Sequence, residues 1–253
     1  TRRSSDLVYP RSFADSNGDG IGDLPGITAR LGSLASLGID AVWLSPFMRS
    51  PQKDAGYDVA DYTDVDPLFG TLANFDAMVA RAHELKLRVL IDLVPNHTSD
   101  QHQWFQDALN EVEGSAERDF YHFKEGRGEN GELPPNNWLS LFGGPAWTRI
   151  TNADGTPGQW YLHLFDSSQP DLNWDNPKVQ EAFEDILRFW LDRGVDGFRV
   201  DQPHAMGKAK GLPDHPDVER AGAGFIEGEP SPPMWFQESV HPIFRKWRNI
   251  LDS

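Results

Sequence analysis

The sequence contains no cysteine. Disulfide bonds, thiolate metal sites and a thiol nucleophile are therefore excluded, and the redox state of the compartment is left open. Basic residues are also scarce, since 23 Lys and Arg stand against 39 Asp and Glu and give a formal net charge of −16. A chain of this charge repels phosphate backbones and anionic lipid headgroups. We therefore expect neither a nucleic-acid partner nor a membrane partner.

Long apolar runs are missing as well. The uninterrupted apolar stretches are only a few residues long, far short of the roughly 20 residues of a membrane-spanning helix. The first residues, Thr1 to Ser5, lead into no apolar signal core. We expect the chain, as given, to be soluble. Its 253 residues suffice for one large domain or two modest ones and exclude a minidomain.

Aromatic residues are abundant, with nine Trp, fifteen Phe and five Tyr. Several Trp stand among polar residues, as in Asn136-Asn137-Trp138 and Asn173-Trp174-Asp175. Flat rings beside amides and carboxylates suit sugars, whose C–H faces stack on aromatics while their hydroxyls take hydrogen bonds. Ordinary aromatic packing is the alternative, and composition alone favours it.

Helical periodicity alternates with short apolar runs along the chain. We expect helices over 27–37, 78–85, 179–191 and 234–251. We expect strands over 6–9, 41–44, 88–94 and 195–200. Thr71 is a candidate cap for the second helix, and Asn176-Pro177 opens the third. Alternating helices and buried strands predict βα units on a parallel sheet.

Polar residues follow each predicted strand. Catalytic groups of barrels and open α/β sheets lie at the carboxyl ends of the strands, so we look for chemistry there. A long polar stretch, 99–175, separates the third strand from the third helix and is rich in Gly, Pro, Asn and Trp. A loop of that length inside a compact domain predicts an inserted subdomain. A second long loop, rich in Pro and Gly, is expected over 208–233.

Residues 15–23 read Asp-Ser-Asn-Gly-Asp-Gly-Ile-Gly-Asp. Alternating oxygen side chains, with a backbone carbonyl near the end of the run, are typical of a loop that binds Ca²⁺ or Mg²⁺. Gly26 stands where an EF-hand needs a glutamate, so the loop belongs to a different setting. A solvated turn without an ion is the alternative. The candidate ligands are Asp15, Asn17, Asp19, Ile21 and Asp23.

Three segments near strand ends carry groups suited to binding or catalysis. Arg199 and Asp201 share one face of a predicted strand. An Arg two residues before an Asp on a strand can hold that carboxylate ionised, as a carboxylate nucleophile requires; a structural ion pair is the alternative, which this pattern alone favours. His97 either binds a ligand or links two loops. Tyr57 and Asp58 offer a ring beside an acid, or form a plain turn.

Six motifs occur in a characteristic order. They are Val8 to Phe13, the loop at 15–23, Gly56 to Asp58, Asp92 to Thr98, Gln169 to Trp174 and Gly197 to Asp201. Together they resemble the α-amylase family of glycoside hydrolases, especially the N-terminal half of its bacterial α-glucosidase and oligo-1,6-glucosidase branch. The resemblance runs from about Leu7 to Ser253.

This resemblance implies an α/β fold of the (β/α)₈ barrel family, with the first four βα units present and a B domain inserted after strand 3. The first three units are then expected in 1–98 and the inserted domain in 99–170. The third helix, fourth strand and fourth helix follow in 171–253. The rest of the barrel and a C-terminal domain fall outside the chain.

The resemblance also implies a reaction, retaining hydrolysis of terminal α-glucosidic bonds in short sugars such as maltose, sucrose or isomaltose-like compounds. One carboxylate attacks the anomeric carbon and a second carboxylic acid protonates the leaving oxygen. Asp201 corresponds to the nucleophile, and Arg199 to its orienting partner. The implied substrate-binding residues are Tyr57, Asp58, His97, Phe165, Gln169, Arg199 and His204. The resemblance implies a structural Ca²⁺, or Mg²⁺, at the loop of residues 15–23. It also implies that the protein is located in the cytoplasm of a bacterium.

The general acid of this family is a Glu at the end of strand five, which falls beyond Ser253. Glu227 and Glu229 lie in the predicted loop 208–233, and Glu238 lies on the predicted last helix. We therefore do not expect any of them to replace the general acid. The chain alone is therefore expected to be inactive or nearly so, unless a complementary C-terminal half supplies the acid. Gln202-Pro203-His204 departs from the usual sequence after the nucleophile and leaves the preferred linkage open.

Two alternatives remain at this point. A sucrose isomerase or transglucosylase of the same family shares the covalent intermediate but passes the glucosyl group to a sugar. A non-catalytic relative would use the barrel for protein association. The presence of both Arg199 and Asp201 argues against the non-catalytic alternative.

Overall fold

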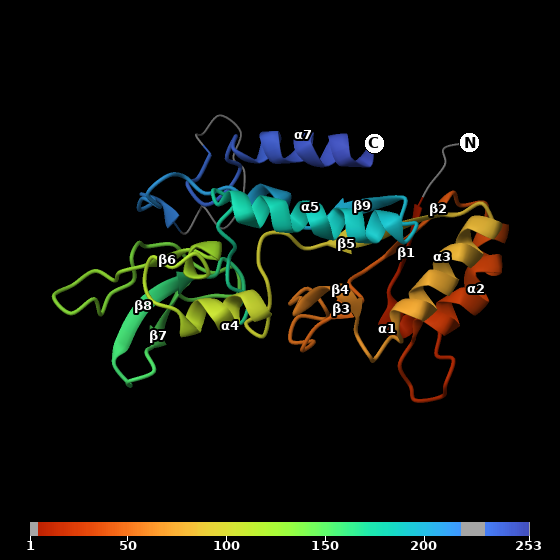
Figure 1. Cartoon of the computed structure of the whole chain (residues 1–253), viewed down its shortest axis with the longest axis horizontal. Helices are drawn as coiled ribbons and strands as arrows, with labels where there is room; N and C mark the ends of the chain where they lie inside the picture. Colours follow the sequence, from red (N-terminus) through yellow and green to blue (C-terminus); the bar gives the residue numbers. More distant parts are fainter. Residues whose placement is uncertain (1–4, 219–230, 253) are drawn as a thin grey trace. The chain divides into compact units, whose positions relative to one another are not determined.

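A computed structural model of the chain describes residues 5–218 and 231–252. Its contacts divide the chain into two compact units. Unit 1 comprises residues 1–94, 184–201 and 250–253, and unit 2 comprises residues 95–183 and 202–249. Figure 1 traces the elements of both units along the chain. The domain boundaries expected from the sequence, after residues 98 and 170, stay predictions.

Unit 1 is built on a parallel sheet. Within the described residues the sheet has four strands in the order β1 (Ser5–Val8), β2 (Ala41–Leu44), β5 (Arg88–Leu93) and β9 (Gly197–Val200). All three pairings are parallel. The four strands expected from the sequence are thus confirmed, apart from shifts of up to two residues at their ends. β1 ends at Val8 because Pro10 opens the next helix with Tyr9 at its N-cap.

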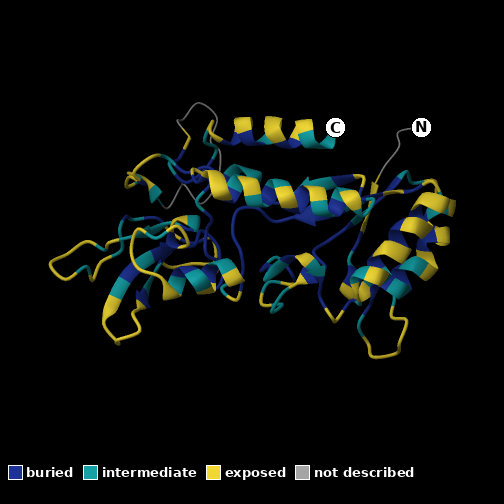
Figure 2. Cartoon of the chain, in the orientation of Figure 1, coloured by how far each residue is buried: buried dark blue, intermediate teal, exposed yellow. Residues whose placement is uncertain are grey.

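Two helices of unit 1 follow the first two strands of the sheet. In α2 (Leu24–Ser36) the Asp23 side chain accepts a hydrogen bond of 2.6 Å from the backbone N–H of Gly26. In α3 (Leu72–Glu84) Thr71 and Asn74 form a capping box, which confirms the predicted cap. The two helices lie side by side, each with one buried and one exposed face (Figures 1 and 2).

Three short elements of unit 1 were not predicted from the sequence. They are α1 (Pro10–Phe13) and the antiparallel pair β3 (Met48–Arg49) and β4 (Asp61–Val65). The core of this unit contains an aromatic group of Phe47, Phe75 and Trp190, with ring centroids 4.9 to 5.4 Å apart. Trp190 Nε1 also donates a 2.7 Å hydrogen bond to the carbonyl of Tyr62, so the buried indole leaves no unsatisfied donor.

Unit 2 contains a small antiparallel sheet and a helix within the long polar stretch of the sequence. The sheet has the order β6 (Phe123–Lys124), β8 (Pro157–Leu162) and β7 (Trp147–Thr151). The helix is α4 (Gln103–Asn110), followed by the 3₁₀ turn η1 (Arg118–Phe120). The insertion therefore has secondary structure of its own, as the length of the stretch predicted.

The two C-terminal helices differ in how well the sequence located them. The third helix predicted from the sequence is α5 (Pro177–Asp192), and the boundary between the two units passes through it. At its start, Asn176 Oδ1 accepts a 2.9 Å hydrogen bond from the backbone N–H of Lys178. The last helix, α7 (Val240–Leu251), begins six residues later than the predicted 234. The prediction was wrong there because Phe236 adopts the left-handed region, with φ of 56°, which no α-helix accommodates. Part of the predicted loop 208–233, with Glu227 and Glu229, lies outside the described residues.

The two tryptophans in polar sequence surroundings are buried. Trp138 is 1% exposed and donates to the carbonyl of Pro213, while Trp174 is 3% exposed and donates to the carbonyl of Pro95. Trp138 belongs to a hydrophobic cluster of unit 2 that also contains Trp147, Leu164 and Trp235. Ordinary packing, rather than sugar stacking, thus explains these two rings.

No helix formed by residues 5–218 and 231–252 is long and apolar enough to cross a membrane.

Candidate active site

Unit 1 brings Asp201 and Arg199 together with a second carboxylate, Asp92. The parallel register of β5 and β9 places Asp92 opposite Arg199. Arg199 Nη1 donates to Asp92 Oδ1 at 2.9 Å and also to Asp201 Oδ1. The backbone N–H of Asp201 continues the ladder with a 2.8 Å bond to the carbonyl of Leu93. One guanidinium therefore serves two carboxylates at the carboxyl end of the sheet.

Burial and Arg199 oppose each other in setting the pKa values of these acids. Burial raises the pKa of Asp92 to about 6, against the hydrogen bond and charge of Arg199. Burial also raises the pKa of Asp201. The charge and hydrogen bond of Arg199 lower this pKa, whereas the charge of Asp54 raises it further. The side chain of Asp92 is 0% exposed and that of Asp201 is 10% exposed. Asp201 is therefore the more exposed acid of this pair.

Two aromatic residues, Trp43 and Tyr57, contact Arg199 and Asp92. The Arg199 guanidinium lies over the ring of Trp43, 5.1 Å from its centroid, at a distance typical of cation–π attraction. Tyr57 donates its hydroxyl to Asp92 Oδ2 at 3.2 Å, and burial, followed by the charges of Asp92 and Asp201, raises the pKa of the phenol. The phenol therefore stays protonated and remains a hydrogen-bond donor at neutral pH.

Asp58 is wholly buried in the loop that also carries Tyr57. Its carboxylate accepts bonds of 2.9 to 3.0 Å from Ser50 Oγ and from the backbone N–H groups of Lys53 and Asp54. Gly56, with φ of 98°, allows the chain to turn beside Pro46, where an added Cβ would lie 3.0 Å from the Pro46 carbonyl oxygen. Asp58 thus closes its own loop, and its predicted binding of a sugar hydroxyl stays a prediction.

In unit 2, His97, Phe165 and Gln169 form a group. His97 is 1% exposed, and its ring centroid lies 4.9 Å from that of Phe165. Gln169 Nε2 lies 3.2 Å from His97 Nε2, and Asn96 Nδ2 lies 3.2 Å from His97 Nδ1. Three of the predicted substrate-binding residues are therefore neighbours within this unit.

His204 lies in another aromatic group of unit 2. It belongs to the 3₁₀ turn η2 (Pro203–Ala205), and its ring lies 5.3 Å from that of Trp235 and 4.9 Å from that of Phe236. Burial, followed by the charge of Lys208, lowers the pKa of His204. The ring is thus neutral at pH 7, and its predicted contact with substrate stays a prediction.

The loop of residues 15–23 is organised by its own polar side chains. Asp15 accepts from the N–H groups of Asn17, Gly18 and Gly20, and backbone bonds, foremost that of Gly20, lower its pKa. The Asp23 carboxylate accepts hydrogen bonds from Ser16 and, as the cap of α2, from the N–H of Gly26. In the part of the chain described, no three His, Cys, Asp or Glu side chains form a group that could hold a metal ion. An ion would therefore also need the Asn17 amide and the Ile21 carbonyl.

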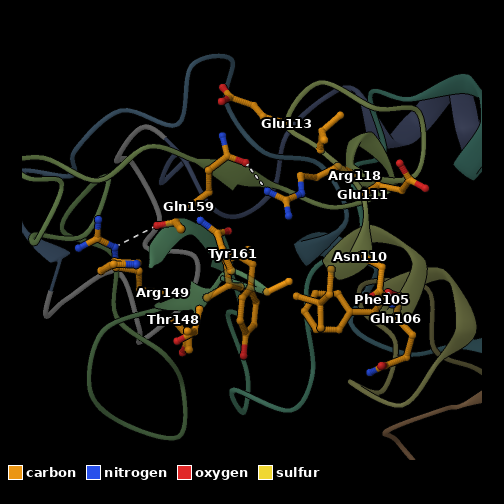
Figure 3. A pocket seen from close by; sticks show the side chains of 18 of the residues that line it. Phe105, Gln106, Asn110, Glu111, Glu113, Arg118, Thr148, Arg149, Gln159 and Tyr161 are labelled. Carbon is orange, nitrogen blue, oxygen red and sulfur yellow. Dashed lines mark hydrogen bonds between the residues drawn. The ribbon is translucent and has the colours of Figure 1, made fainter. Parts of the chain in front are cut away.

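A groove of about 860 Å³ lies in unit 2 beside α4, β7 and β8 (Figure 3). Arg118 and Gln159 meet there through a 3.1 Å hydrogen bond, and Tyr161 contributes its ring to the lining. None of the predicted site residues is among the residues that line the groove. Its size alone does not connect it with the chemistry expected from the sequence.

Asp92 and Lys208 are the residues that sequence reasoning missed. Asp92 interrupts the apolar run of the strand at 88–93, which was the available signal. Lys208 is buried against Asp171, with 2.8 Å between Nζ and Oδ2, and a lysine in a Pro/Gly-rich segment gave no sign of this partner.

The raised pKa of Asp92 makes the stability of the chain depend on pH. Burial raises the pKa of Asp92 to about 6 in the folded protein, whereas the pKa of an Asp in the unfolded chain is near 4. The stabilisation that comes from protonated Asp92 is therefore fully present below pH about 4 and is lost as the pH rises through about 6. We expect wild type to lose about 2 kcal/mol of unfolding free energy relative to Asp92→Asn between pH 4 and pH 7. Urea unfolding of both proteins across this range measures it, and parallel profiles would contradict it.

Charged groups at the carboxyl end of a parallel sheet are found both in barrel enzymes and in open α/β sheets. The chain belongs to the α-amylase family, because the profile of the alpha amylase catalytic domain matches residues 7–250. This membership and the solved structures that the chain resembles confirm the (β/α)₈ barrel class, with its first four units present. Relatives named alpha-glucosidase and oligo-1,6-glucosidase confirm the branch expected from the sequence.

Three relatives illustrate the likeness. A probable alpha-glucosidase of Rhizobium meliloti is 55% identical over 97% of this chain and 45% of its own length. An oligo-1,6-glucosidase of Heyndrickxia coagulans is 46% identical over 95% of this chain and 42% of its own. The crystal structure of the trehalulose synthase MutB of Pseudomonas mesoacidophila has a TM-score of 0.85 and 39% identity, covering 98% of this chain and 42% of that one. The chain thus spans less than half the length of these relatives.

Proposed function

We propose that this chain provides the nucleophile half of a retaining α-glucosidase that acts on short α-glucosides. The observation that carries the proposal is Arg199, whose guanidinium is shared between the buried Asp92 and the partly accessible Asp201. Membership of the α-amylase family supports it, as do relatives named alpha-glucosidase and oligo-1,6-glucosidase.

In the proposed reaction Asp201 attacks the anomeric carbon and forms a covalent glucosyl ester, while the bond to the leaving oxygen breaks. A second carboxylic acid protonates that oxygen and afterwards activates the water that cleaves the ester. The positive charge of Arg199 favours the ionised, nucleophilic form of Asp201 against the effect of burial. We assign that second acid to the remaining barrel units, so that the chain alone has little or no activity.

The proposed substrate contacts follow the family pattern. The ring of Tyr57 stacks on the non-reducing glucose, and Asp58 and His97 bind its hydroxyls. The other proposed substrate-binding residues are Phe165, Gln169 and His204. Phe165 and Gln169 are neighbours of His97. Because the net charge is −16, neutral sugars suit the protein better than anionic substrates. We also propose a cytoplasmic location in a bacterium, in keeping with the bacterial branch of the family.

The test combines the chain with a polypeptide that carries the remaining barrel units. We expect glucose release from maltose, sucrose or isomaltose only with both pieces present. A mechanism-based α-glucosyl label should attach to Asp201. Robust turnover by the lone chain would contradict the assignment of the acid to the other half. Failure of the label to reach Asp201 in the combined protein would favour a non-catalytic role.

Glucosyl transfer is the second candidate reaction. A trehalulose synthase has the same fold with a TM-score of 0.85 over 98% of this chain, and a transferase shares the covalent intermediate. Analysis of the products from sucrose separates the two. Free glucose and fructose support hydrolysis, whereas an isomeric disaccharide supports transfer.

We further propose that Asp15, Asn17, Asp19, Asp23 and the carbonyl of Ile21 hold a structural Ca²⁺, or Mg²⁺. All are oxygen donors, as these cations prefer. The ion would add rigidity to the loop and takes no part in the proposed reaction.

Removal of the metal should therefore lower thermal stability. At a Ca²⁺ concentration about 100 times the Kd, binding should add about 2.7 kcal/mol of unfolding free energy relative to chelated protein. Asp15→Asn should lose most of this gain, whereas Asp192→Asn, an exposed residue at the end of α5, should keep it. Thermal unfolding with Ca²⁺ and with chelator measures the gain. An identical melting temperature in both conditions would remove the assignment.

A further inference from the structure

The groove of unit 2 has a buried arginine in its wall. Arg118 lines the groove and is 7% exposed. Its guanidinium lies over the ring of Phe123, 4.8 Å from the centroid, and Nε donates to the carbonyl of Ala108 at 3.0 Å. Nη1 donates to Gln159 Oε1 at 3.1 Å (Figure 3). Within residues 5–218 and 231–252, Arg118 has no carboxylate partner, and its Nη2 has no acceptor.

Gln159 is a second buried donor in the same wall. It lines the groove and is 8% exposed. A guanidinium only donates, so the amide oxygen of Gln159 must face Arg118, and the amide nitrogen Nε2 points elsewhere. In the part of the chain described, this Nε2 has no acceptor either. Neither Arg118 nor Gln159 is among the described residues whose unpartnered polar atoms are sealed from solvent, so these N–H groups are accessible.

The free N–H groups of Arg118 and Gln159 require an oxygen. A guanidinium has five N–H groups, of which Arg118 uses two within the described chain. A buried polar group without an acceptor is destabilising by about 1–3 kcal/mol, and burial lowers the pKa of Arg118. Water supplies the oxygen in the free protein, and a ligand oxygen that replaces this water keeps the same bonds.

The charges along the groove disfavour an anion as the source of that oxygen. Glu113 and Glu125 act on Arg118 by their charge. Acidic residues outnumber arginines among the lining residues, since four acids stand against two arginines: Asp100, Glu111, Glu113 and Glu125 against Arg118 and Arg149. A phosphate or carboxylate ligand would therefore meet net repulsion, which a neutral ligand does not.

Hydroxyl groups match both kinds of group in the groove. A hydroxyl accepts hydrogen bonds, as Arg118 and Gln159 require, and it donates one, as the exposed carboxylates of Glu111, Glu113 and Glu125 require. A ligand that carries many hydroxyls and no charge is a carbohydrate. The volume of about 860 Å³ lies within the range of sites that hold small organic ligands.

We propose that this groove binds a neutral oligosaccharide, with Arg118 and Gln159 donating to its oxygens and the glutamates accepting from its hydroxyls. All of these residues belong to unit 2. The proposal goes beyond the proposed function, because binding in the groove requires neither Asp201 nor the remaining barrel units.

The experiment titrates the chain with maltotriose and follows the side-chain ¹H–¹⁵N signals of Arg118 and Gln159. Loss of a signal in Arg118→Met or Gln159→Leu assigns it. In wild type we expect both signals to shift to saturation, with a Kd of about 1 mM. Loss of one neutral donor in Gln159→Leu should weaken binding about fivefold, and loss of the charged donor in Arg118→Met about tenfold or more.

Gln103→Leu is the matched control. Gln103 is an exposed residue of α4 that donates to Asp107 and does not line the groove, so its variant should bind maltotriose as wild type does. The proposal is overturned if about 10 mM maltotriose, ten times the expected Kd, shifts neither signal. It is also overturned if inorganic phosphate shifts them and maltotriose does not, because the groove would then select anions.

The result stays decisive if Arg118→Met fails to fold. Wild type and Gln159→Leu then carry the test, and an unchanged affinity in folded Gln159→Leu contradicts the proposal. The titration needs no turnover and is followed at residues of the groove. Its outcome is therefore separate from that of the hydrolysis and labelling experiments on Asp201.

Discussion

Asp201→Asn, tested in the chain combined with the remaining barrel units, is expected to lower kcat for hydrolysis of α-glucosides by about 10⁴-fold or more. Removing a catalytic nucleophile has effects of this size in enzymes that work through a covalent intermediate. The amide is uncharged and a poor nucleophile, yet it has nearly the same volume as the carboxylate. Steady-state kinetics on maltose and mass spectrometry of the α-glucosyl label measure the two expected losses, of turnover and of ester.

Asp64→Asn is a suitable control for this experiment. Asp64 lies on β4 in the same unit, with its side chain 38% exposed, and its partner is the surface residue Arg49 at 3.4 Å. Exposed pairs of this kind contribute little, so kcat should stay within about twofold of wild type. Retention of more than a tenth of the activity by Asp201→Asn, or labelling of a different residue, would show that Asp201 is not the nucleophile.

The elements best predicted from the sequence are those determined by local signals. Ala41 to Leu44 is an apolar run of strand length, and the structure has β2 over the same four residues. Thr71 was predicted as a cap, and it forms a capping box with Asn74. Local signals failed near the last helix, where apolar residues continue the helical spacing back to 234. The backbone at Phe236 is left-handed there, and the pattern of side chains does not report backbone conformation.

The candidate site was predictable where its residues are close in sequence. Arg199 and Asp201 are two apart on a strand, so the period of two places them on one face, and the structure joins them. Asp92 could not be paired with Arg199 in advance, because their contact depends on the register between β5 and β9. The same holds for Lys208 and Asp171, which come from segments separated by α5 and β9. Burial of both charges is visible only once the chain is folded.

The buried ion pair between Lys208 and Asp171 is expected to have a large effect on the stability of the fold. Lys208→Met is expected to lower the unfolding free energy by about 3–5 kcal/mol, because it leaves the carboxylate of Asp171 without its cation in a place that water does not reach. The side chains of both residues are at most 1% exposed, so solvent cannot compensate for the loss. Burial lowers the pKa of Lys208 and Asp171 opposes this, which agrees with a cation that depends on one carboxylate. Urea unfolding at pH 7 measures the effect.

The double variant Lys208→Met/Asp171→Asn separates the cost of an unpaired charge from the cost of a lost contact. Asn at position 171 removes the negative charge but retains an oxygen that can accept from the N–H of Leu164, as Asp171 Oδ1 does at 3.1 Å. The double variant should therefore be more stable than Lys208→Met by about 2 kcal/mol, since breaking a buried pair costs more than replacing it. If Lys208→Met lies within about 1 kcal/mol of wild type, or if the double variant is the less stable of the two, the ion pair does not have the structural role assigned to it.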